Sequence, residues 1–469
     1  MPSPTSHPAR CGLAVLSGAV YALAYPPLGW GWLVVPGLAG LLAALHGQRG
    51  TQARAIGFLH GMAAYAVGFS WMTHIFGGLV LPLWAVHAAF TALFAEMQGR
   101  AGLRGICGWR LAAFTALNWG AWEFIRAELN PLSFPWMTAG LALGPNRMLP
   151  WIGVYAAGLP VVLVAALGVA RNWPAAAAVT LALVLTISAE RPCPPPGADD
   201  PLALKIAGLQ LEGVSVNDYL AATRQLPAGI PYVVWPEYAL PYDLRHDRRD
   251  WPLVQDLCRE RGITLTLGTQ SRPANGDEWR NIALTVDPTG VRGEHNKVHT
   301  VHLFDDGIAG TTARPVLTDH GAVGTPVCFD GDYEGIVRRM TAAGAEVFVV
   351  PSMDAKSWSA RQHDQHAELF RIRACENGRW IFVCATSGVS QVIDPHGQVH
   401  ASLPALAQGP LVGTLKRESR LTPYTRGGWL APWVVLGAAA LWWISLRKPE
   451  ARSQKMEDRR LNPKSDIRS

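Results

Sequence analysis

Charge is scarce in this chain of 469 residues. Asp, Glu, Lys and Arg make up 16% of it, against about 25% in a typical soluble domain. The shortage is local, because charges are sparse before Glu190, whereas residues 200–300 have the composition of an ordinary soluble domain. This imbalance argues against a wholly soluble chain and indicates a membrane part followed by a soluble part.

The seven cysteines lack the spacing of a disulfide-rich or zinc-binding protein. No CxxC pair occurs among them, and they stand at positions 11, 107, 193, 258, 328, 375 and 384. We therefore predict no disulfide framework and no metal centre built on cysteine.

A continuous basic surface is also missing. The net charge is +6, but Lys and Arg lie in short loops and in the C-terminal tail rather than along one stripe. This distribution argues against a nucleic acid partner. The topology of a membrane protein explains this distribution of Lys and Arg better than a nucleic acid partner does.

Eight apolar segments have about the length needed to cross a bilayer as helices, roughly 17–25 residues. They cover residues 11–25, 29–46, 56–72, 76–96, 110–128, 150–170, 172–188 and 429–445. Any one of them could be a buried core helix, but eight in one chain favour membrane spans. The first could instead be a cleaved signal peptide, since Arg10 precedes it; because it leads directly into the second span, we expect a retained helix.

Basic residues alternate between the loops that join these segments. The loops after the first and third spans have none, whereas the loops after the second, fourth and sixth carry Arg49, Arg54, Arg100, Arg104, Arg110 and Arg171. Because basic loops stay in the cytoplasm, we expect both termini inside and the soluble insert outside. The loop after the fifth span is an exception, since Arg126 and Arg147 lie on the expected outer side.

These features divide the chain into five parts. We expect a membrane domain of about seven helices over 1–190, a proline-rich linker over 191–202, a soluble domain over 203–427, a transmembrane helix over 428–446 and a basic cytoplasmic tail over 447–469. The prolines of the linker favour an extended, stiff connection between the membrane and the soluble domain.

Short apolar runs alternate with polar helical stretches from residue 203 onward. The expected strands are 204–211, 229–237, 263–270, 322–329, 345–352 and 379–388, and the expected helices are 251–262 and 360–377. Strands that alternate with helices indicate an α/β layered domain.

Three residues at the ends of apolar runs have the chemistry of a nucleophilic site. Glu237 follows the run "VVWP", where desolvation raises a carboxyl pKa toward that of a general base. Lys297 can stabilise an oxyanion and a thiolate, and Cys328 needs such a base or cation to act as a nucleophile. Taken singly, each is more often a surface carboxylate, a solvated lysine or an inert thiol; their common position favours a joint role.

The stretches "VVWPEYALP", "HNKVHTVHLF" and "PVCFDGDYEG" resemble the three catalytic motifs of the nitrilase (carbon–nitrogen hydrolase) superfamily, whose fold is an α-β-β-α sandwich. Residues 371–399 are similar to the region that follows the nucleophile in those enzymes. The resemblance implies that Cys328 is the nucleophile, Glu237 its general base and Lys297 the stabiliser of oxyanion and thiolate, without a cofactor.

Several spans before this domain and one after it are similar to the apolipoprotein N-acyltransferase family. The stretches "AYPPLGWGWL", "GFSWMTHIFGG" and "WEFIRAELNPLSFPW" resemble membrane segments of that family. The implied fold is a multi-span α-helical membrane domain plus an α/β nitrilase-like α-β-β-α sandwich. The implied enzyme lies in the bacterial inner membrane with its sandwich on the periplasmic side. It takes an acyl chain from a phospholipid, phosphatidylethanolamine, as a thioester and passes it to the diacylglyceryl-cysteine amine of a lipoprotein.

The supporting acids depart from the family pattern. Asp330 stands two residues after Cys328, where a Glu is common in the family, and Asp305 or Asp306 in "HLFDD" replaces the Glu of a "PFGE"-like sequence. Asp354 remains in "SMD", where many members have "SND". The departures concern the residues that position the substrate rather than the triad.

Two further groups of residues have alternative interpretations. The histidines have spacings that suit a metal ion or a polar loop, and they are His295, His299, His302, His363 and His366. We favour the polar loop, because zinc needs a convergent set of ligands. Glu123 and Arg126, three apart on one helical face, are either a pair at an interfacial helix end or a contact to a lipid headgroup.

Two other functions compete with acyl transfer. One is a membrane-tethered amidase of the same superfamily that hydrolyses a small amide or nitrile, and the other is a lipid-binding scaffold without catalysis. The Glu, Lys and Cys together count against the scaffold. The eight apolar segments count against a hydrolase of soluble amides.

Overall fold

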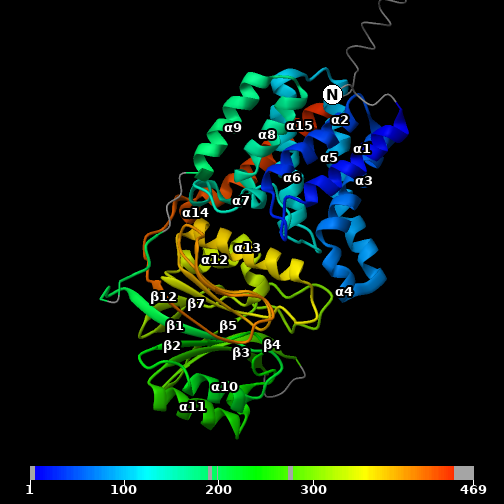
Figure 1. Cartoon of the computed structure of the whole chain (residues 1–469). Helices are drawn as coiled ribbons and strands as arrows, with labels where there is room; N and C mark the ends of the chain where they lie inside the picture. The colour runs from blue at the N-terminus through cyan, green and yellow to red at the C-terminus, as the bar shows by residue number, and fades with distance from the viewer. Residues whose placement is uncertain (1–5, 189–192, 198, 273–277, 448–469) are drawn as a thin grey trace, which may run out of the picture.

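A helical part and a layered α/β part lie one above the other in the computed structural model, which describes residues 6–188, 193–197, 199–272 and 278–447 (Figure 1). The basic tail predicted over 447–469 lies outside these ranges except for Arg447. The helical part consists of α1 (His7–Ala22), α2 (Val34–Leu45), α3 (Gly50–Gly68), α4 (Thr73–Phe76), α5 (Val80–Leu103), α6 (Gly108–Glu128), α7 (Leu149–Ala157), α8 (Leu159–Val169), α9 (Trp173–Ser188) and α15 (Ala431–Arg447).

The apolar segments of the sequence all overlap helices of this part, but the helices differ in length. By length and composition, two described helical segments can cross a membrane, Ser70–Leu103 and Gly428–Leu446. The pair Leu149–Ala157 and Leu159–Val169, bent by 47°, makes a third if it is one span, and Gly31–Leu45 and Trp173–Ile187 are shorter apolar helices. The number of eight spans stays a prediction.

Small residues allow close packing inside the helical part. On α3, a Cβ atom added to Gly57 would lie 2.6 Å from the carbonyl oxygen of Thr91 on α5, and one added to Gly61 would lie 2.7 Å from the Cα atom of Ala88. Such contacts between small residues are typical of helices that pack in a membrane. Large apolar side chains such as Leu181 on α9 point outward and are exposed, which suits a lipid-facing surface.

The α/β part contains two six-stranded sheets with the same internal plan. Their strands are β1 (Ala203–Gln210), β2 (Tyr232–Trp235), β3 (Thr264–Ser271), β4 (Arg280–Asp287), β5 (Gly290–Asn296), β6 (Val316–Thr318), β7 (Gly321–Gly324), β8 (Val347–Ser352), β9 (Ile381–Ala385), β10 (Ser390–Ile393), β11 (Val399–Leu403) and β12 (Gly409–Lys416). The spatial orders are β12-β1-β2-β3-β4-β5 and β11-β10-β9-β8-β7-β6. In each sheet three neighbouring strands are parallel, β1–β3 in one and β7–β9 in the other, and the remaining pairings are antiparallel.

Helices cover the outer face of each sheet. The helices α10 (Val216–Arg224) and α11 (Asp250–Arg261) lie on the first sheet, while α12 (Glu334–Ala342) and α13 (Ala360–Asn377) lie between the second sheet and the helical part (Figure 1). Residues such as Val234 and Phe382 fill the core between the sheets. The fold class predicted from the sequence, an α-helical membrane domain plus an α-β-β-α sandwich, is confirmed.

Two local predictions need correction at the ends of strands. The strand expected over 322–329 ends at Gly324, and Cys328 instead begins a 3-10 turn, Cys328–Gly331. Parallel pairing with β8 stops at Gly324, so the following apolar residues are buried without being part of the sheet. The strand expected over 229–237 likewise ends at Trp235, two residues before Glu237.

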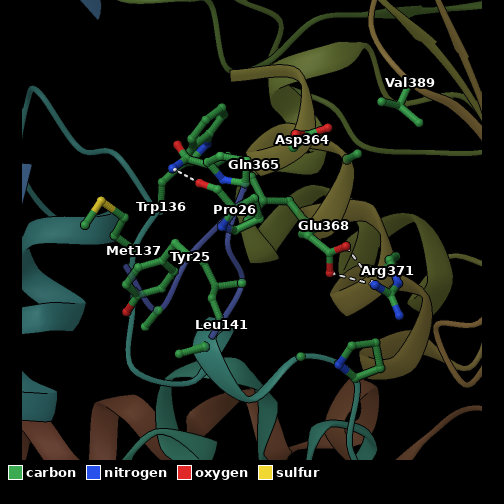
Figure 2. Close-up of a pocket in the computed structure, with 18 of the residues that line it drawn as sticks. Tyr25, Pro26, Trp136, Met137, Leu141, Asp364, Gln365, Glu368, Arg371 and Val389 are labelled. Carbon is green, nitrogen blue, oxygen red and sulfur yellow. Dashed lines mark hydrogen bonds and ion pairs between the residues drawn. The ribbon is translucent and has the colours of Figure 1, made fainter. Parts of the chain in front are cut away.

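The helix α13 joins the two parts through polar contacts to backbone groups. The Gln365 amide donates to the carbonyl oxygens of Pro26 (3.1 Å) and Gly68 (3.0 Å), and it accepts a hydrogen bond from the Trp71 indole (3.0 Å). Figure 2 shows Gln365 beside Pro26 and Trp136 at this joint, next to a cavity of about 670 Å³. The helical part is therefore attached directly to a helix of the sandwich.

Candidate active site

Cys328 begins a tight turn after β7 and has an unusual backbone. Its φ is +47°, in the left-handed region that residues other than glycine seldom adopt. Such strain persists where the surrounding structure enforces it, and it is common at reactive residues. The side chain is 5% exposed, and its thiol lies 3.6 Å from the carbonyl oxygen of Met353.

Lys297 lies between two carboxylates beside this turn. It follows β5 directly, and its ammonium is 2.8 Å from Glu237 Oε1 and 2.8 Å from Asp306 Oδ2. The Asn281 amide also donates to both acids, at 2.6 Å and 2.8 Å. Since all four side chains are buried, the ammonium and the amide together compensate two charges that have lost their water.

A glycine allows Glu237 to enter this site. A Cβ atom on Gly268 of β3 would lie 2.3 Å from the Cα atom of Glu237, closer than any side chain tolerates. The backbone after β2 therefore passes directly over β3, and this close approach directs the Glu237 carboxylate toward Lys297.

The pKa values in this group follow from burial and from the neighbouring charges. Burial raises the pKa of Glu237, with Lys297 opposing the shift. Burial disfavours the charged form of Lys297, but Glu237 and Asp306 outweigh it and raise the pKa of the ammonium. Burial, then the charge of Glu237, raises the pKa of the Cys328 thiol well above its usual range. The resting thiol is therefore neutral, and a nucleophilic role of Cys328 would require a base such as Glu237.

The two candidates for a second acid next to Lys297 lie in different surroundings. Asp306 is buried in the network, where its carboxylate also accepts hydrogen bonds from the Tyr238 hydroxyl (2.5 Å) and the Val301 backbone N–H (2.8 Å). Asp305 is exposed. The ion pair with Lys297 outweighs burial and lowers the pKa of Asp306, so this acid stays charged.

Asp330 connects the turn of Cys328 to the loop of Lys297. Its buried carboxylate accepts hydrogen bonds from the backbone N–H groups of Val298 (2.9 Å) and His299 (2.7 Å), and it contacts the His295 ring nitrogen at 2.9 Å. Burial opposes its charge, but these histidines hold the pKa of Asp330 well below its usual range. Asp330 therefore fixes the turn of Cys328 and the loop of Lys297 relative to each other through these contacts.

Asp354 lies in a second buried network that the sequence did not indicate as one unit. Its carboxylate is 2.7 Å from His366 Nδ1, and the other ring nitrogen of His366 is 3.1 Å from Asp332. Burial opposes a charge on the ring, but the two acids raise the pKa of His366 well above its usual value. Asp332 also accepts a hydrogen bond of 2.6 Å from the Trp136 indole. This network therefore links the sandwich to the helical part.

The histidines considered as metal ligands have other partners. His295 contacts Asp330, His302 lies 3.0 Å from the carbonyl oxygen of Ser133, and His363 lies 3.2 Å from that of Ala355. Across the described ranges, no group of three or more His, Cys, Asp or Glu side chains could hold a metal ion.

A cavity of about 410 Å³ reaches Cys328, and both parts of the molecule line it. The sandwich contributes Glu237, Lys297, Cys328 and Phe329 among others. The helical part contributes Trp71, Met72, Ile75, Phe76, Leu83, His87, Leu132, Phe134 and Trp136. Sequence reasoning missed this contribution, although "SFPW" (133–136) lies in a stretch that resembled a known family. Glu237, Lys297 and Cys328 thus share one cavity with apolar side chains of the helical part.

Comparisons with known proteins match both parts of the chain. Residues 163–422 match the carbon-nitrogen hydrolase family, and residues 17–167 match the apolipoprotein N-acyltransferase N-terminal domain. The chain is 26% identical to the apolipoprotein N-acyltransferase of Geobacter metallireducens over 94% of this chain and 96% of that protein. The enzymes of that name from Pseudomonas aeruginosa (27%, over 91% and 95%) and Azotobacter vinelandii (28%, over 94% and 96%) are similar to a like extent.

Substitution of the second acid should distinguish the two aspartates. Asp306→Asn removes a charge that holds Lys297, so we expect kcat/KM for acylation of Cys328 by p-nitrophenyl acetate to fall about ten- to hundredfold. Asp305→Asn is the matched control and should stay within about twofold of the wild type. Equal losses in the two variants would contradict the assignment of Asp306.

The pH dependence of acylation should report Glu237. The base must be ionised, and burial raises its pKa, so kcat/KM should rise with pH through a midpoint above the ordinary value of about 4.3. Because the charge of Asp306 contributes to this rise, the midpoint should move down in Asp306→Asn. The measurement is the pH profile of kcat/KM. A midpoint at or below that of an ordinary glutamate would exclude this account of the base.

Proposed function

The chain belongs to the carbon-nitrogen hydrolase family, and we propose that it uses the Cys of that family for acyl transfer within a membrane rather than for hydrolysis. It is an N-acyltransferase that acts on lipoproteins, as its relatives are named. One observation carries this assignment beyond the family. The cavity that reaches Cys328 is walled by apolar side chains of the helical part, so it suits a fatty acyl chain better than a small polar amide.

The first half-reaction forms a thioester on Cys328. Glu237 removes the thiol proton as the sulfur attacks the ester carbonyl of a phospholipid, and the ammonium of Lys297 stabilises the oxyanion of the tetrahedral intermediate. When the intermediate collapses, the ester C–O bond breaks and Glu237 returns the proton to the leaving alcohol. The products are lysophospholipid and an acylated Cys328. The proposed donor is phosphatidylethanolamine.

The second half-reaction transfers the acyl chain to an amine. The free α-amine of a diacylglyceryl-cysteine at the N-terminus of a lipoprotein attacks the thioester, and Glu237 accepts its proton. The C–S bond then breaks, and Glu237 returns the proton to the leaving sulfur. The amide remains on the lipoprotein, and the Cys328 thiol is regenerated. An apolar cavity disfavours water as the competing acceptor.

The proposed location is the bacterial inner membrane, with the sandwich on the periplasmic side and both termini in the cytoplasm. The alternation of basic and neutral loops supports this orientation. The described N-terminal end lies at the end of the helical part away from the sandwich, and α15 runs from the sandwich back toward that end (Figure 1). This arrangement of the described helices supports the proposal that both termini lie on the face of the membrane opposite the sandwich.

Product analysis tests the proposed function. We expect the protein in detergent, given phosphatidylethanolamine and a synthetic diacylated lipopeptide, to yield a triacylated lipopeptide detectable by mass spectrometry. Cys328→Ala should lose at least about 10³-fold in rate, because the covalent route is removed. Ammonia released from small amides without any triacylated product would instead favour an amidase. Full activity in Cys328→Ala would refute the mechanism.

A further inference from the structure

A loop of the helical part forms one wall of the cavity at Cys328. The loop joins α6 to α7, and its aromatic side chains lie on the sandwich. Phe134 packs on Phe329, the neighbour of Cys328, with ring centroids 6.0 Å apart. Trp136 stacks on His366 at 5.9 Å and 15°, and its indole donates to Asp332. The position of this loop therefore sets the shape of the cavity.

Two charged side chains on α6 hold the backbone of this loop. The guanidinium of Arg126 donates to the carbonyl oxygens of Phe134 (2.8 Å) and Trp136 (2.9 Å). The carboxylate of Glu123 accepts the backbone N–H of Ala139 at 2.8 Å. Because the planar guanidinium presents two donors in a fixed geometry, Arg126 fixes the carbonyls of both aromatic residues at once.

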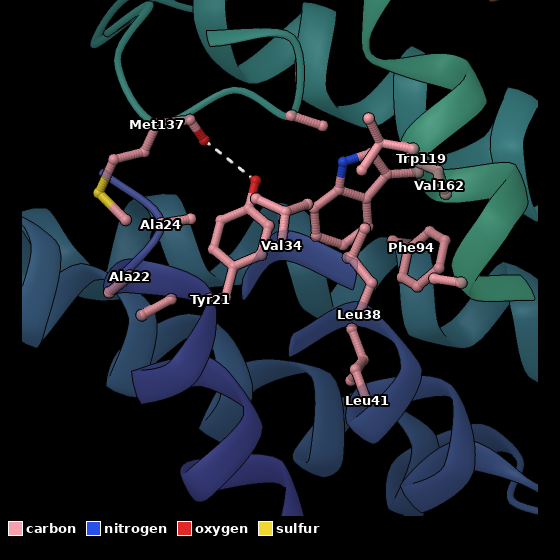
Figure 3. Packing of buried hydrophobic residues seen from close by; sticks show 14 of the residues in the cluster. Tyr21, Ala22, Ala24, Val34, Leu38, Leu41, Phe94, Trp119, Met137 and Val162 are labelled. Atoms are coloured by element: carbon pink, nitrogen blue, oxygen red, sulfur yellow. Dashed lines mark hydrogen bonds between the residues drawn. The ribbon is translucent and has the colours of Figure 1, made fainter. Parts of the chain in front are cut away.

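Two tyrosines, Tyr21 on α1 and Tyr25 in the turn that follows it, hold the residues between these contacts. The Tyr21 hydroxyl donates to the carbonyl oxygen of Met137 at 3.2 Å (Figure 3), and the Tyr25 hydroxyl donates to that of Thr138 at 2.9 Å. Met137 has a φ of +56°, a conformation that such external contacts must maintain. Every residue from 136 to 139 thus has a backbone group bound to a side chain of the helical part.

Burial excludes the roles that the sequence left open for the charged pair. The exposed fraction is 6% for Glu123 and 2% for Arg126. The two residues therefore do not form a surface pair at a helix end. Neither side chain presents its charge to a lipid headgroup in this structure. Burying a charge costs free energy unless the charged group forms hydrogen bonds. Arg126 and Glu123 form theirs with the backbone of the loop.

We infer that Arg126 and Glu123 are positioning residues for acyl transfer, acting through the loop that places Phe134 and Trp136 against the Cys328 turn. This inference rests on the proposed function, since it concerns how the acyl chain is accommodated. Neither side chain is among those that line the Cys328 cavity. Their loss should therefore impair long-chain donors selectively and leave the chemistry of Cys328 intact.

Two donors of different size separate these effects. We expect Arg126→Lys to lower kcat/KM for dipalmitoyl phosphatidylethanolamine by about tenfold or more, because lysine lacks the planar pair of nitrogens that each bind one carbonyl, and the cavity wall shifts. Acylation of Cys328 by p-nitrophenyl acetate, which needs little of the cavity, should change by less than about threefold. Glu123→Leu should behave like Arg126→Lys, whereas Glu123→Gln retains a hydrogen-bond acceptor and should keep most of the long-chain activity.

A matched pair of charges elsewhere in the helical part provides the control. Arg54 and Glu96 form an ion pair of 3.0 Å between α3 and α5, where Arg54 is exposed. Arg54→Lys and Glu96→Gln should leave both donors within about twofold. A loss of equal size with both donors in Arg126→Lys, or no loss with either, would overturn the inference.

The remaining outcomes are also decisive. If Arg126→Lys does not fold, Tyr25→Phe removes a single anchor of the loop and should lower only the long-chain rate, by about threefold; an unchanged ratio of the two rates would then overturn the inference. A wild-type protein that reacts with p-nitrophenyl acetate but never with phospholipid would refute the proposed function instead. The two failures are therefore distinguishable.

Discussion

The buried ammonium of Lys297 is the charge on which the rest of the site depends. It pairs with Glu237 and with Asp306, at 2.8 Å from each, and removing one partner of a buried ion pair typically costs about 3–5 kcal/mol. Without it, two carboxylates would face each other next to the thiol of Cys328. With it, in the proposed mechanism, Glu237 acts as a base while the cation remains available to an oxyanion. Under this proposal, stability and catalysis rely on the same contact.

The two parts of the molecule complete one cavity, and neither could form it alone. The sandwich supplies the reactive groups, and the helical part supplies the apolar wall through Phe134 and Trp136. The Trp136 indole hydrogen-bonds to Asp332, while Gln365 on α13 holds the backbone of Pro26 after α1. The helical part thus adds an apolar wall beside Cys328, and this wall supports the proposed fatty acyl substrate.

Local patterns in the sequence predicted the layered fold and the residues that meet at the site. The helix expected over 360–377 has the bounds Ala360–Asn377, because apolar periodicity and the Gly378 cap are local signals. The backbone at Cys328 was not predictable, since a left-handed turn depends on the surrounding packing. The choice between Asp305 and Asp306 depends on the path of one loop. The contact of Trp136 with Asp332 joins residues far apart in the chain, and composition carries no information about it.

The most direct test of the account is the covalent state of Cys328 when phospholipid is supplied without an acceptor. Intact-protein mass spectrometry should show a mass increase of one fatty acyl chain. Peptide mapping should place the chain on Cys328, and neutral hydroxylamine should remove it, as expected for a thioester. Addition of the diacylated lipopeptide should discharge the chain at a rate compatible with turnover. An acyl chain on another residue, or product formation without any acylated enzyme, would contradict the account.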